Sequence, residues 1–342
     1  MVKNFLQIFL ALVGLFFAIP SVAQDPEFSQ FYSAPMNLNP ALSGIAYGPR
    51  FNLNFRNEWP KIEKGYITTA FSYDQHFERI NSGVGFFIMN DRVADGLIKS
   101  ITVRASYSYQ IRLADKVGLR IGLNAGLTNK RLDLSRLYFN DQIDPLYGFQ
   151  NVNGLANVTS EQLPASGKIN NPDFGAGFVA YSPNIYGGLS FQHIIPFKET
   201  LIQNDSSLTY KAPVKATIHA GGVIDLTPKK RESDKYISPN ALVTLQSGAS
   251  QLNVGVMANI EFIYFGAYYR HTFRNNDAVI GLVGFKAGYF RMGYSYDFTI
   301  SELESSGGAH EVSMMINFGS DNGPLDPSRK TSRLKCPSSL NF

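Results

Sequence analysis

Hydrophobic and polar residues alternate one by one through much of the chain. In residues 101–112 the odd positions carry Ile, Val, Ala, Tyr, Tyr and Ile, whereas the even positions carry Thr, Arg, Ser, Ser, Gln and Arg. Residues 116–128 and 289–299 repeat the pattern. Because successive side chains of a strand point to opposite faces, a period of two predicts β-strands with one apolar and one polar face.

About 14 segments of this kind follow one another along the chain. Their expected ranges are 50–58, 65–74, 83–91, 99–112, 116–128, 174–182, 185–194, 214–225, 236–247, 250–261, 262–273, 278–287, 288–299 and 309–318. Many exceed the usual five or six residues of soluble strands and suit strands that cross a bilayer at a tilt, which need about 9–11 residues. An even strand number is typical of bacterial outer-membrane barrels.

A soluble β-sandwich or propeller also alternates, because one face of each sheet packs on a core. Here the apolar faces are unusually aromatic, while the polar faces carry Gly, Ser, Asn and Arg, as the wall of a wet lumen does. Aromatic residues also gather near strand ends, as at Tyr264 and Phe265, and the last strand ends on Phe318. We therefore predict an all-β fold, a transmembrane antiparallel β-barrel of about 14 strands.

The composition agrees with a barrel. Of 342 residues 44% are hydrophobic, 13% aromatic and 17% charged, against a usual charged share of about 25%, yet the mean hydropathy is only −0.10. Alternation explains this, since residues that face lipid and residues that face water cancel in the average. The single Cys excludes an internal disulfide framework. The net charge of +4 is mild and the basic residues are spread out, which argues against nucleic acid as a partner.

Residues 1–23 have the three parts of a secretory signal peptide: Lys3, an apolar run, and Ser21-Val22-Ala23. The run is shorter than the roughly 20 residues of a membrane anchor and ends at Pro20. We expect cleavage before Gln24 and an outer-membrane location. An even strand number then places both ends in the periplasm, with the inserts 129–173 and 195–213 on the cell surface and 226–235 in the periplasm.

Two terminal segments flank the predicted barrel, 50–318. The N-terminal arm, 24–49, contains four prolines among large apolar residues, which suits either an ordered arm inside the barrel or a simple periplasmic leader. The C-terminal tail, 319–342, contains four basic and two acidic residues, three prolines and Cys336. It is either a periplasmic strap that docks on a partner or a frayed end.

Candidate sites for chemistry are weak. His219 shares a polar face with Lys215, Thr217 and Asp225, as a hydrolase would require, but no Ser sits in a Gly-flanked nucleophile turn. Asp141, Asp144 and Glu161 offer oxygen ligands for calcium without the spacing of a known loop, and Asp144-Pro145 favours a turn. We therefore predict a protein without catalytic, metal or cofactor sites.

The insert 129–173 combines aromatic residues with carboxylates, a combination that favours a protein contact over a solvated loop. The candidate partner-binding residues are Tyr138, Phe139, Asp141, Asp144, Tyr147 and Phe149.

The stretch Gln24-Asp25-Pro26-Glu27-Phe28-Ser29-Gln30-Phe31-Tyr32, followed by Asn37-Leu38-Asn39-Pro40-Ala41-Leu42-Ser43-Gly44, resembles the opening of the PorP/SprF family of type IX secretion system membrane proteins. Gln30, Phe31, Asn39, Pro40 and Gly44 represent this motif. The resemblance continues at 56–60, 141–145 and 333–337 and departs from the family at Leu42-Ser43, where an aromatic residue and Ala are expected.

The resemblance implies a non-enzymatic outer-membrane barrel of the type IX secretion system of Bacteroidota. Members serve export or cell-surface attachment of particular cargo, often large adhesins used in gliding motility, by holding the cargo's C-terminal domain. It also implies contacts with the translocon and with the periplasmic ring of the machinery. The alternative is a porin-like barrel, or one for apolar solutes, with the arm as a plug.

Overall fold

The computed structural model describes residues 25–46, 48–62, 65–160, 167–195, 198–199, 210–226, 235–247, 249–273, 275–301 and 304–318. The expected signal peptide, the tail 319–342 with Cys336, Glu161 and the basic run 229–231 lie outside these residues. Within the described part of the chain, no helix is long and apolar enough to cross a membrane.

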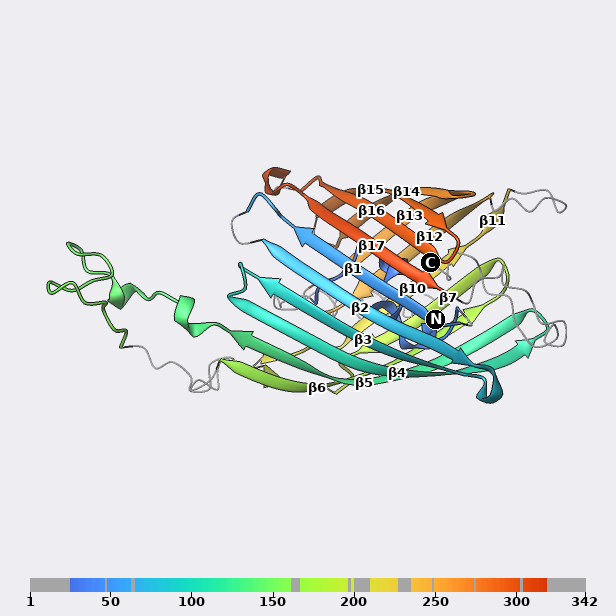
Figure 1. The fold of residues 1–342 in the computed structure, drawn as a ribbon, viewed down its shortest axis with the longest axis horizontal. Helices are drawn as coiled ribbons and strands as arrows, with labels where there is room; N and C mark the ends of the chain where they lie inside the picture. The colour runs from blue at the N-terminus through green and yellow to red at the C-terminus, as the bar shows by residue number, and fades with distance from the viewer. Residues whose placement is uncertain are drawn as a thin grey trace, which may run out of the picture.

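The strands form a closed antiparallel barrel of 14 strands (Figure 1). Each strand pairs with its neighbour in the chain, and β1 pairs with β17 to complete the ring. The barrel strands are β1 (Arg50–Glu58), β2 (Tyr66–Phe77), β3 (Ser82–Val93), β4 (Ile98–Ala114), β5 (Val117–Leu132), β6 (Lys168–Tyr181), β7 (Ile185–Gln192), β10 (Lys215–Gly222), β12 (Lys235–Leu245), β13 (Gln251–Ile260), β14 (Ile263–Thr272), β15 (Asn276–Ala287), β16 (Phe290–Thr299) and β17 (Ala309–Asn317).

The remaining elements are short. A two-residue strand, β11 (Ile224–Asp225), pairs with β12, and β8 (Lys198–Glu199) pairs with β9 (Tyr210–Lys211) in a separate hairpin. The arm contains η1 (Phe31–Ser33), α2 (Pro35–Leu38) and η2 (Pro40–Leu42). Further single turns are η3 (Glu78–Ile80), η4 (Leu134–Arg136), η5 (Asn140–Gln142) and η7 (Glu304–Ser306).

The predicted barrel and its strand number are confirmed, but both strand boundaries at the long insert are wrong. β5 ends at Leu132 rather than at 128. β6 begins at Lys168 rather than at 174, so the long insert spans 133–167 instead of 129–173. Pro172 made this segment look unlike a strand. The carbonyl of Phe174 accepts from Ile194 on the β7 side, and Pro172, two residues away, faces the same side, where its missing N–H breaks no ladder.

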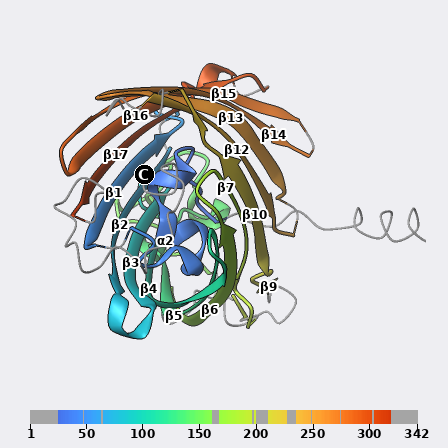
Figure 2. The same cartoon turned by 90° about the vertical axis from the view of Figure 1, so that its right-hand side faces the viewer.

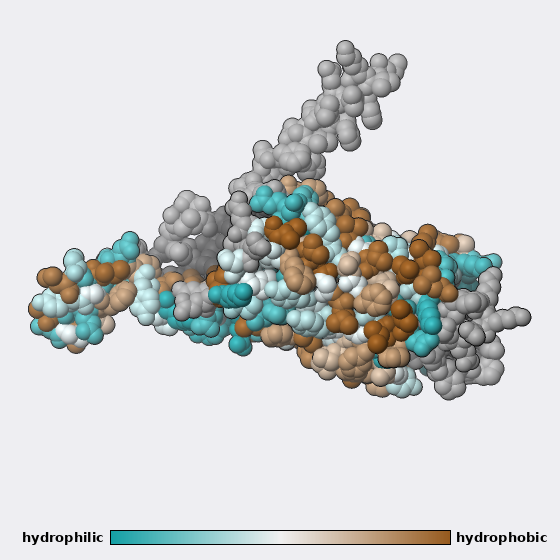
Figure 3. Space-filling model, turned by 90° about the horizontal axis from the view of Figure 1, so that it is seen from above, coloured by the Kyte–Doolittle hydropathy of each residue, from teal (hydrophilic) through white to brown (hydrophobic). Residues whose placement is uncertain are grey.

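The barrel wall is polar inside and apolar outside. Ile101, Tyr107 and Tyr109 on β4 are 42–48% exposed, whereas Thr102, Arg104, Ser106 and Ser108 between them are buried. Figure 3 shows hydrophobic residues gathered over the barrel strands and a mixture of both kinds on the projecting insert. The alternation of the sequence therefore separates a lipid-facing surface from the lumen.

The two mouths of the barrel differ. The start of β1 and the end of β17 lie at one mouth, which we call the β1 mouth. β5 and β7 end, and β6 and β10 begin, at the other, the insert mouth, and the described residues 133–160 project far beyond the strands (Figure 1). The topology therefore groups the two inserts at one end and the connection 226–234 at the other.

The arm lies inside the ring of strands (Figure 2). It starts at Asp25, beside His193 and Gln246 at the insert mouth, and ends where β1 begins, at the opposite mouth. Asp25 and the end of β17 thus lie at opposite mouths, which differs from the expectation of two ends on one side. The reason is that strand number fixes only where the strands end, and the arm crosses the lumen before the first strand.

Candidate functional site

The arm is buried almost throughout the lumen. Met36, Ala41, Leu42 and Ile45 are at most 2% exposed. Its prolines interrupt regular structure as expected, yet Pro35 and Pro40 also start the short helices α2 and η2, a position where their missing N–H costs nothing. The arm is therefore an ordered part of the barrel interior rather than a loose leader.

The first part of the motif contacts β14, β16 and β17. The backbone N–H of Gln30 donates to Glu311 at 2.9 Å, and its side-chain amide donates to Ser295 and accepts from Ser313. Phe31 packs edge-on against Tyr268 with the ring centres 6.0 Å apart. These contacts explain why an amide and an aromatic ring stand side by side in the motif.

A buried charge cluster surrounds Ser29. Arg56 reaches Asp297 at 2.9 Å and Glu311 at 3.2 Å, and Arg270 reaches Asp297 at 2.8 Å. The Ser29 hydroxyl accepts from both arginines and donates to Asp297 at 2.6 Å. Because buried charges are stable only when paired and hydrogen-bonded, the arm completes a cluster that the wall alone leaves short of a partner.

Asn39 and Pro40 fit against glycines of β5 and β6. The Asn39 amide donates to the carbonyls of Phe178 and Leu189 at 3.1 and 3.2 Å. A Cβ added at Gly177 would lie 2.0 Å from Asn39 Oδ1, and one at Gly122 would lie 2.4 Å from the carbonyl carbon of Pro40. Only glycine lets the arm backbone approach the wall this closely.

Gly44 ends the motif with φ of +70°, a backbone conformation that favours glycine. Its N–H donates to Asp74 at 2.7 Å, and Arg50 donates to the same carboxylate at 2.9 Å. An added Cβ would meet the Gln75 carbonyl oxygen at 2.8 Å. All five motif residues thus lie where the arm meets the wall.

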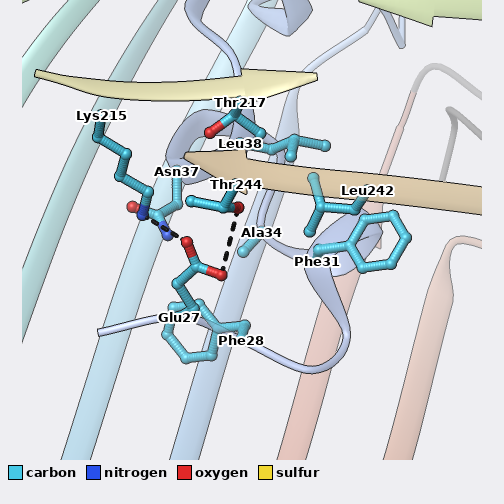
Figure 4. A pocket seen from close by; sticks show the side chains of 10 residues that line it. All are labelled: Glu27, Phe28, Phe31, Ala34, Asn37, Leu38, Lys215, Thr217, Leu242 and Thr244. Atoms are coloured by element: carbon cyan, nitrogen blue, oxygen red, sulfur yellow. Dashed lines mark hydrogen bonds and ion pairs between the residues drawn. The ribbon is translucent and has the colours of Figure 1, made fainter. Parts of the chain in front are cut away.

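The start of the arm is held at the insert mouth. His193 bonds Asp25 at 2.7 Å and Asp173 at 2.9 Å, and Glu27 pairs with Lys215 at 2.9 Å in a pocket between the arm, β10 and β12 (Figure 4). Burial alone would lower the pKa of His193, but the hydrogen bonds to the two carboxylates raise it to about 9. The imidazole is therefore positively charged at neutral pH and bridges arm and wall.

His219, the residue of the hydrolase hypothesis, is buried against the arm. Its Nε2 lies 3.1 Å from the Asn39 amide nitrogen and its ring is buried. Thr217 is buried beside the same pocket, Lys215 pairs with Glu27, and Asp225 lies on β11 beyond the end of β10. The four residues that the hydrolase hypothesis places on one polar face therefore make separate structural contacts and do not meet in one site.

The candidate partner residues lie on the projecting insert. The rings of Tyr138 and Phe149 contact each other with their centres 4.9 Å apart and their planes tilted by 46°, and Tyr147 is half exposed. Neighbouring apolar residues are more exposed still, with Leu146 at 86% and Val158 at 89%. Apolar side chains this exposed on a projecting segment favour a binding surface.

The two candidate carboxylates, Asp141 and Asp144, hold the backbone of the insert in place. Asp141 accepts from the backbone N–H of Ser160 at 2.6 Å and from its hydroxyl at 2.8 Å, and these bonds lower its pKa. Asp144 accepts from the N–H groups of Leu146 and Tyr147, which forms the expected turn. Among the residues that the structure describes, no group of three or more His, Cys, Asp or Glu side chains is placed to hold a metal ion.

Directly below the insert, β6 has an open edge. β6 pairs with β5 along its whole length but with β7 only from Ala176 to Tyr181. The backbone groups of Lys168 and Asn170, and the carbonyl of Pro172, face the β7 side, where no described strand pairs with them. Sequence reasoning missed this edge, because pairing lengths do not appear in a single sequence.

Comparison with known proteins identifies related sequences and folds. The family model described as type IX secretion system membrane protein PorP/SprF matches residues 21–316. Among solved structures, the Ralstonia pickettii toluene transporter TbuX is 12% identical with a TM-score of 0.45, covering 83% of this chain and 92% of its own. The Acinetobacter baumannii outer membrane protein Omp33 is 8% identical with a TM-score of 0.43, covering 80% of this chain and 100% of its own.

Proposed function

The chain belongs to the PorP/SprF family of type IX secretion system membrane proteins, and on that premise we propose that it is a non-enzymatic outer-membrane partner that holds the C-terminal domain of an exported cargo. The cargo is a protein destined for the cell surface, such as a gliding adhesin. The observation that carries the proposal is the projecting insert, whose exposed aromatic and aliphatic side chains lie next to an open strand edge.

In this proposal the insert mouth faces the cell exterior and the β1 mouth faces the periplasm. The long connections then lie outside and the short ones inside, as is usual for such barrels. The β1 mouth, where the tail begins, is the end that meets the translocon and the periplasmic ring.

The open edge of β6 supplies a way to hold an extended segment. Its backbone groups that no described strand pairs with can form main-chain hydrogen bonds with an added strand, while side chains of the insert contact the rest of the cargo. Pro172 lacks an N–H, so pairing is limited to about the segment 168–171. A short edge of this kind suits a transient grip.

The porin-like alternative has less support. The arm is buried among the side chains of the wall and joined to it by hydrogen bonds at both mouths and in the middle. A passive channel requires a continuous water-filled path, and here the lumen holds a folded segment of the chain instead.

The test replaces residues 134–166 with a short Gly-Ser linker in cells that carry the native secretion machinery. We expect the barrel to assemble in the outer membrane while its cargo no longer reaches the cell surface. A matched control replaces residues 273–275, the connection between β14 and β15 at the same mouth, and leaves cargo at the surface. Normal export by the first variant refutes the proposal, and purified barrel that conducts ions as a steady open pore favours the porin-like alternative.

A further inference from the structure

Four cations lie side by side on the outer face of the barrel near the insert mouth. The strand registers place Arg92 of β3 opposite Lys99 of β4, Lys99 opposite Arg131 of β5, and Arg131 opposite Lys168 of β6. They lie at the ends of β3–β6 that point toward the projecting insert (Figure 1). We call these four residues the cation row.

All four side chains are exposed and point away from the lumen. They share the parity of Ile101, Leu127 and Phe174, which face outward, whereas neighbours such as Asp91 face inward. No ion pair joins any of the four to a carboxylate in the described part of the chain. The pKa of Asp133 is lowered mainly by a hydrogen bond from Ser135 and also by the positive charges of Arg131 and Lys99, so this exposed carboxylate offsets only part of the charge of the row.

Such an arrangement disfavours the bare protein, because like charges directly opposite each other on neighbouring strands repel. Strands lie about 4.8 Å apart, so the row spans about 14 Å and concentrates four positive charges. An anionic ligand of similar width removes the repulsion. Arginine and lysine side chains both bind phosphate oxygens, arginine through two parallel hydrogen bonds.

The position of the row relative to the apolar surface indicates which anionic ligand the row binds. The next outward row, Asn90, Ile101, Asn129 and Asn170, is mostly polar, and the row after it, Ile88, Val103, Leu127 and Pro172, is apolar. The cations are four residues from that apolar row, about 13 Å along the strand and about 10 Å along the membrane normal at the usual tilt. Long basic side chains at this level reach the headgroup phosphates.

We propose that the cation row binds the phosphate groups of lipid A, the anchor of lipopolysaccharide in the outer leaflet. The choice of lipid A rests on the proposed orientation, with the insert mouth facing the cell exterior, whereas the phosphate chemistry rests on the row alone. Bound lipid A fixes the depth of β3–β6 in the membrane and thereby the height of the insert, with the open β6 edge beginning at the level of the row.

The test uses the full barrel purified in detergent and titrated with phosphorylated lipid A, with lipid A stripped of its phosphates, and with phosphatidylglycerol. The variant carries Lys99→Gln, Arg131→Gln and Lys168→Gln. The control removes three exposed cations at the β1 mouth with Arg79→Gln, Arg112→Gln and Lys116→Gln. Binding is measured by native mass spectrometry and by the shift of the melting temperature.

We expect wild type and control to bind phosphorylated lipid A within about twofold of each other. The row variant is expected to bind about 100-fold more weakly, since each cation near an anionic headgroup contributes about fivefold. Without lipid the row variant melts at a higher temperature than wild type, because the repulsion is gone.

Equal binding of the stripped lipid, or equal loss in row variant and control, overturns the proposal. Equal affinity for phosphatidylglycerol overturns the assignment to lipid A. None of these measurements involves cargo, so their failure is distinguishable from failure of the proposed function.

Discussion

Substituting Gly122 by Ala tests whether the arm is seated in the lumen as described. The added Cβ would lie 2.3 Å from the nitrogen of Ala41 and 2.4 Å from the carbonyl carbon of Pro40, both backbone atoms. Overpacking a tight site costs about 1–3 kcal/mol, and rigid backbone neighbours place this substitution at the upper end. A loss of about 3 kcal/mol lowers the ratio of seated to released arm about 150-fold.

The assay measures maleimide labelling of a thiol at the buried position 33, introduced as Ser33→Cys with Cys336→Ser to remove the native thiol. Labelling is expected to accelerate about 100-fold in the Gly122→Ala barrel. Gly281→Ala is the matched control, because its Cβ meets only Phe298 at 3.7 Å, and its labelling rate stays within about twofold of the parent. An unchanged rate in Gly122→Ala refutes the seating of the arm against β5.

Three further perturbations address other contacts. Arg56→Met removes the buried cation that pairs with Glu311 and is expected to lower the free energy of unfolding in urea by about 3–5 kcal/mol. The control, Arg136→Met at the exposed pair with Asp95, is expected to lower it by less than about 1 kcal/mol. Equal losses in the two variants contradict the buried cluster. The pKa of His193 is raised from 6.5 to about 9, so its contribution to holding Asp25 is complete below pH 6.5 and is lost as the pH rises through 9. Because thiolate formation alone speeds maleimide labelling over this range, the labelling rate of Ser33→Cys in the Cys336→Ser background is divided by that of a cysteine at the exposed position Arg79. This ratio is expected to rise through pH 9, whereas in His193→Gln it is expected not to change with pH; a ratio without pH dependence in the parent contradicts the role of His193. Asp141→Ala removes the acceptor for Ser160, so amide hydrogen exchange is expected to quicken in 150–160 without a change in barrel melting; unchanged exchange contradicts the role of Asp141 in holding the insert.

The strands were predictable because lipid outside and polar wall inside impose a strict period of two on each crossing. β4 shows this most clearly, since the odd positions from 101 to 109 face outward and the even positions from 102 to 108 face the lumen. The start of β6 was not predictable, because Asn170, Asn171 and Pro172 disfavour strands in general. Pro172 is tolerated because β7 does not pair with β6 at this position. The length of that pairing depends on the strand register, which the local sequence does not contain.

The candidate sites, too, could be predicted from the sequence only in part. The arm motif was visible, and its prolines and apolar residues indicated burial, but its partners were not. Gly122 and Gly177 stand far from Asn39 and Pro40 in sequence, and only the closed ring brings them together. The cation row is the extreme case, because positions 92, 99, 131 and 168 become neighbours only through three strand registers.

The most direct test of the account is cross-linking to the cargo in living cells. A photoreactive amino acid at Tyr147, half exposed on the insert, is compared with one at Tyr289, equally exposed at the β1 mouth. We predict that the position 147 probe captures the C-terminal domain of a secreted protein, that the position 289 probe does not, and that capture falls when residues 150–160 are deleted. Capture from both positions alike, or from neither while cargo still reaches the surface, would contradict the proposal that the insert holds the cargo.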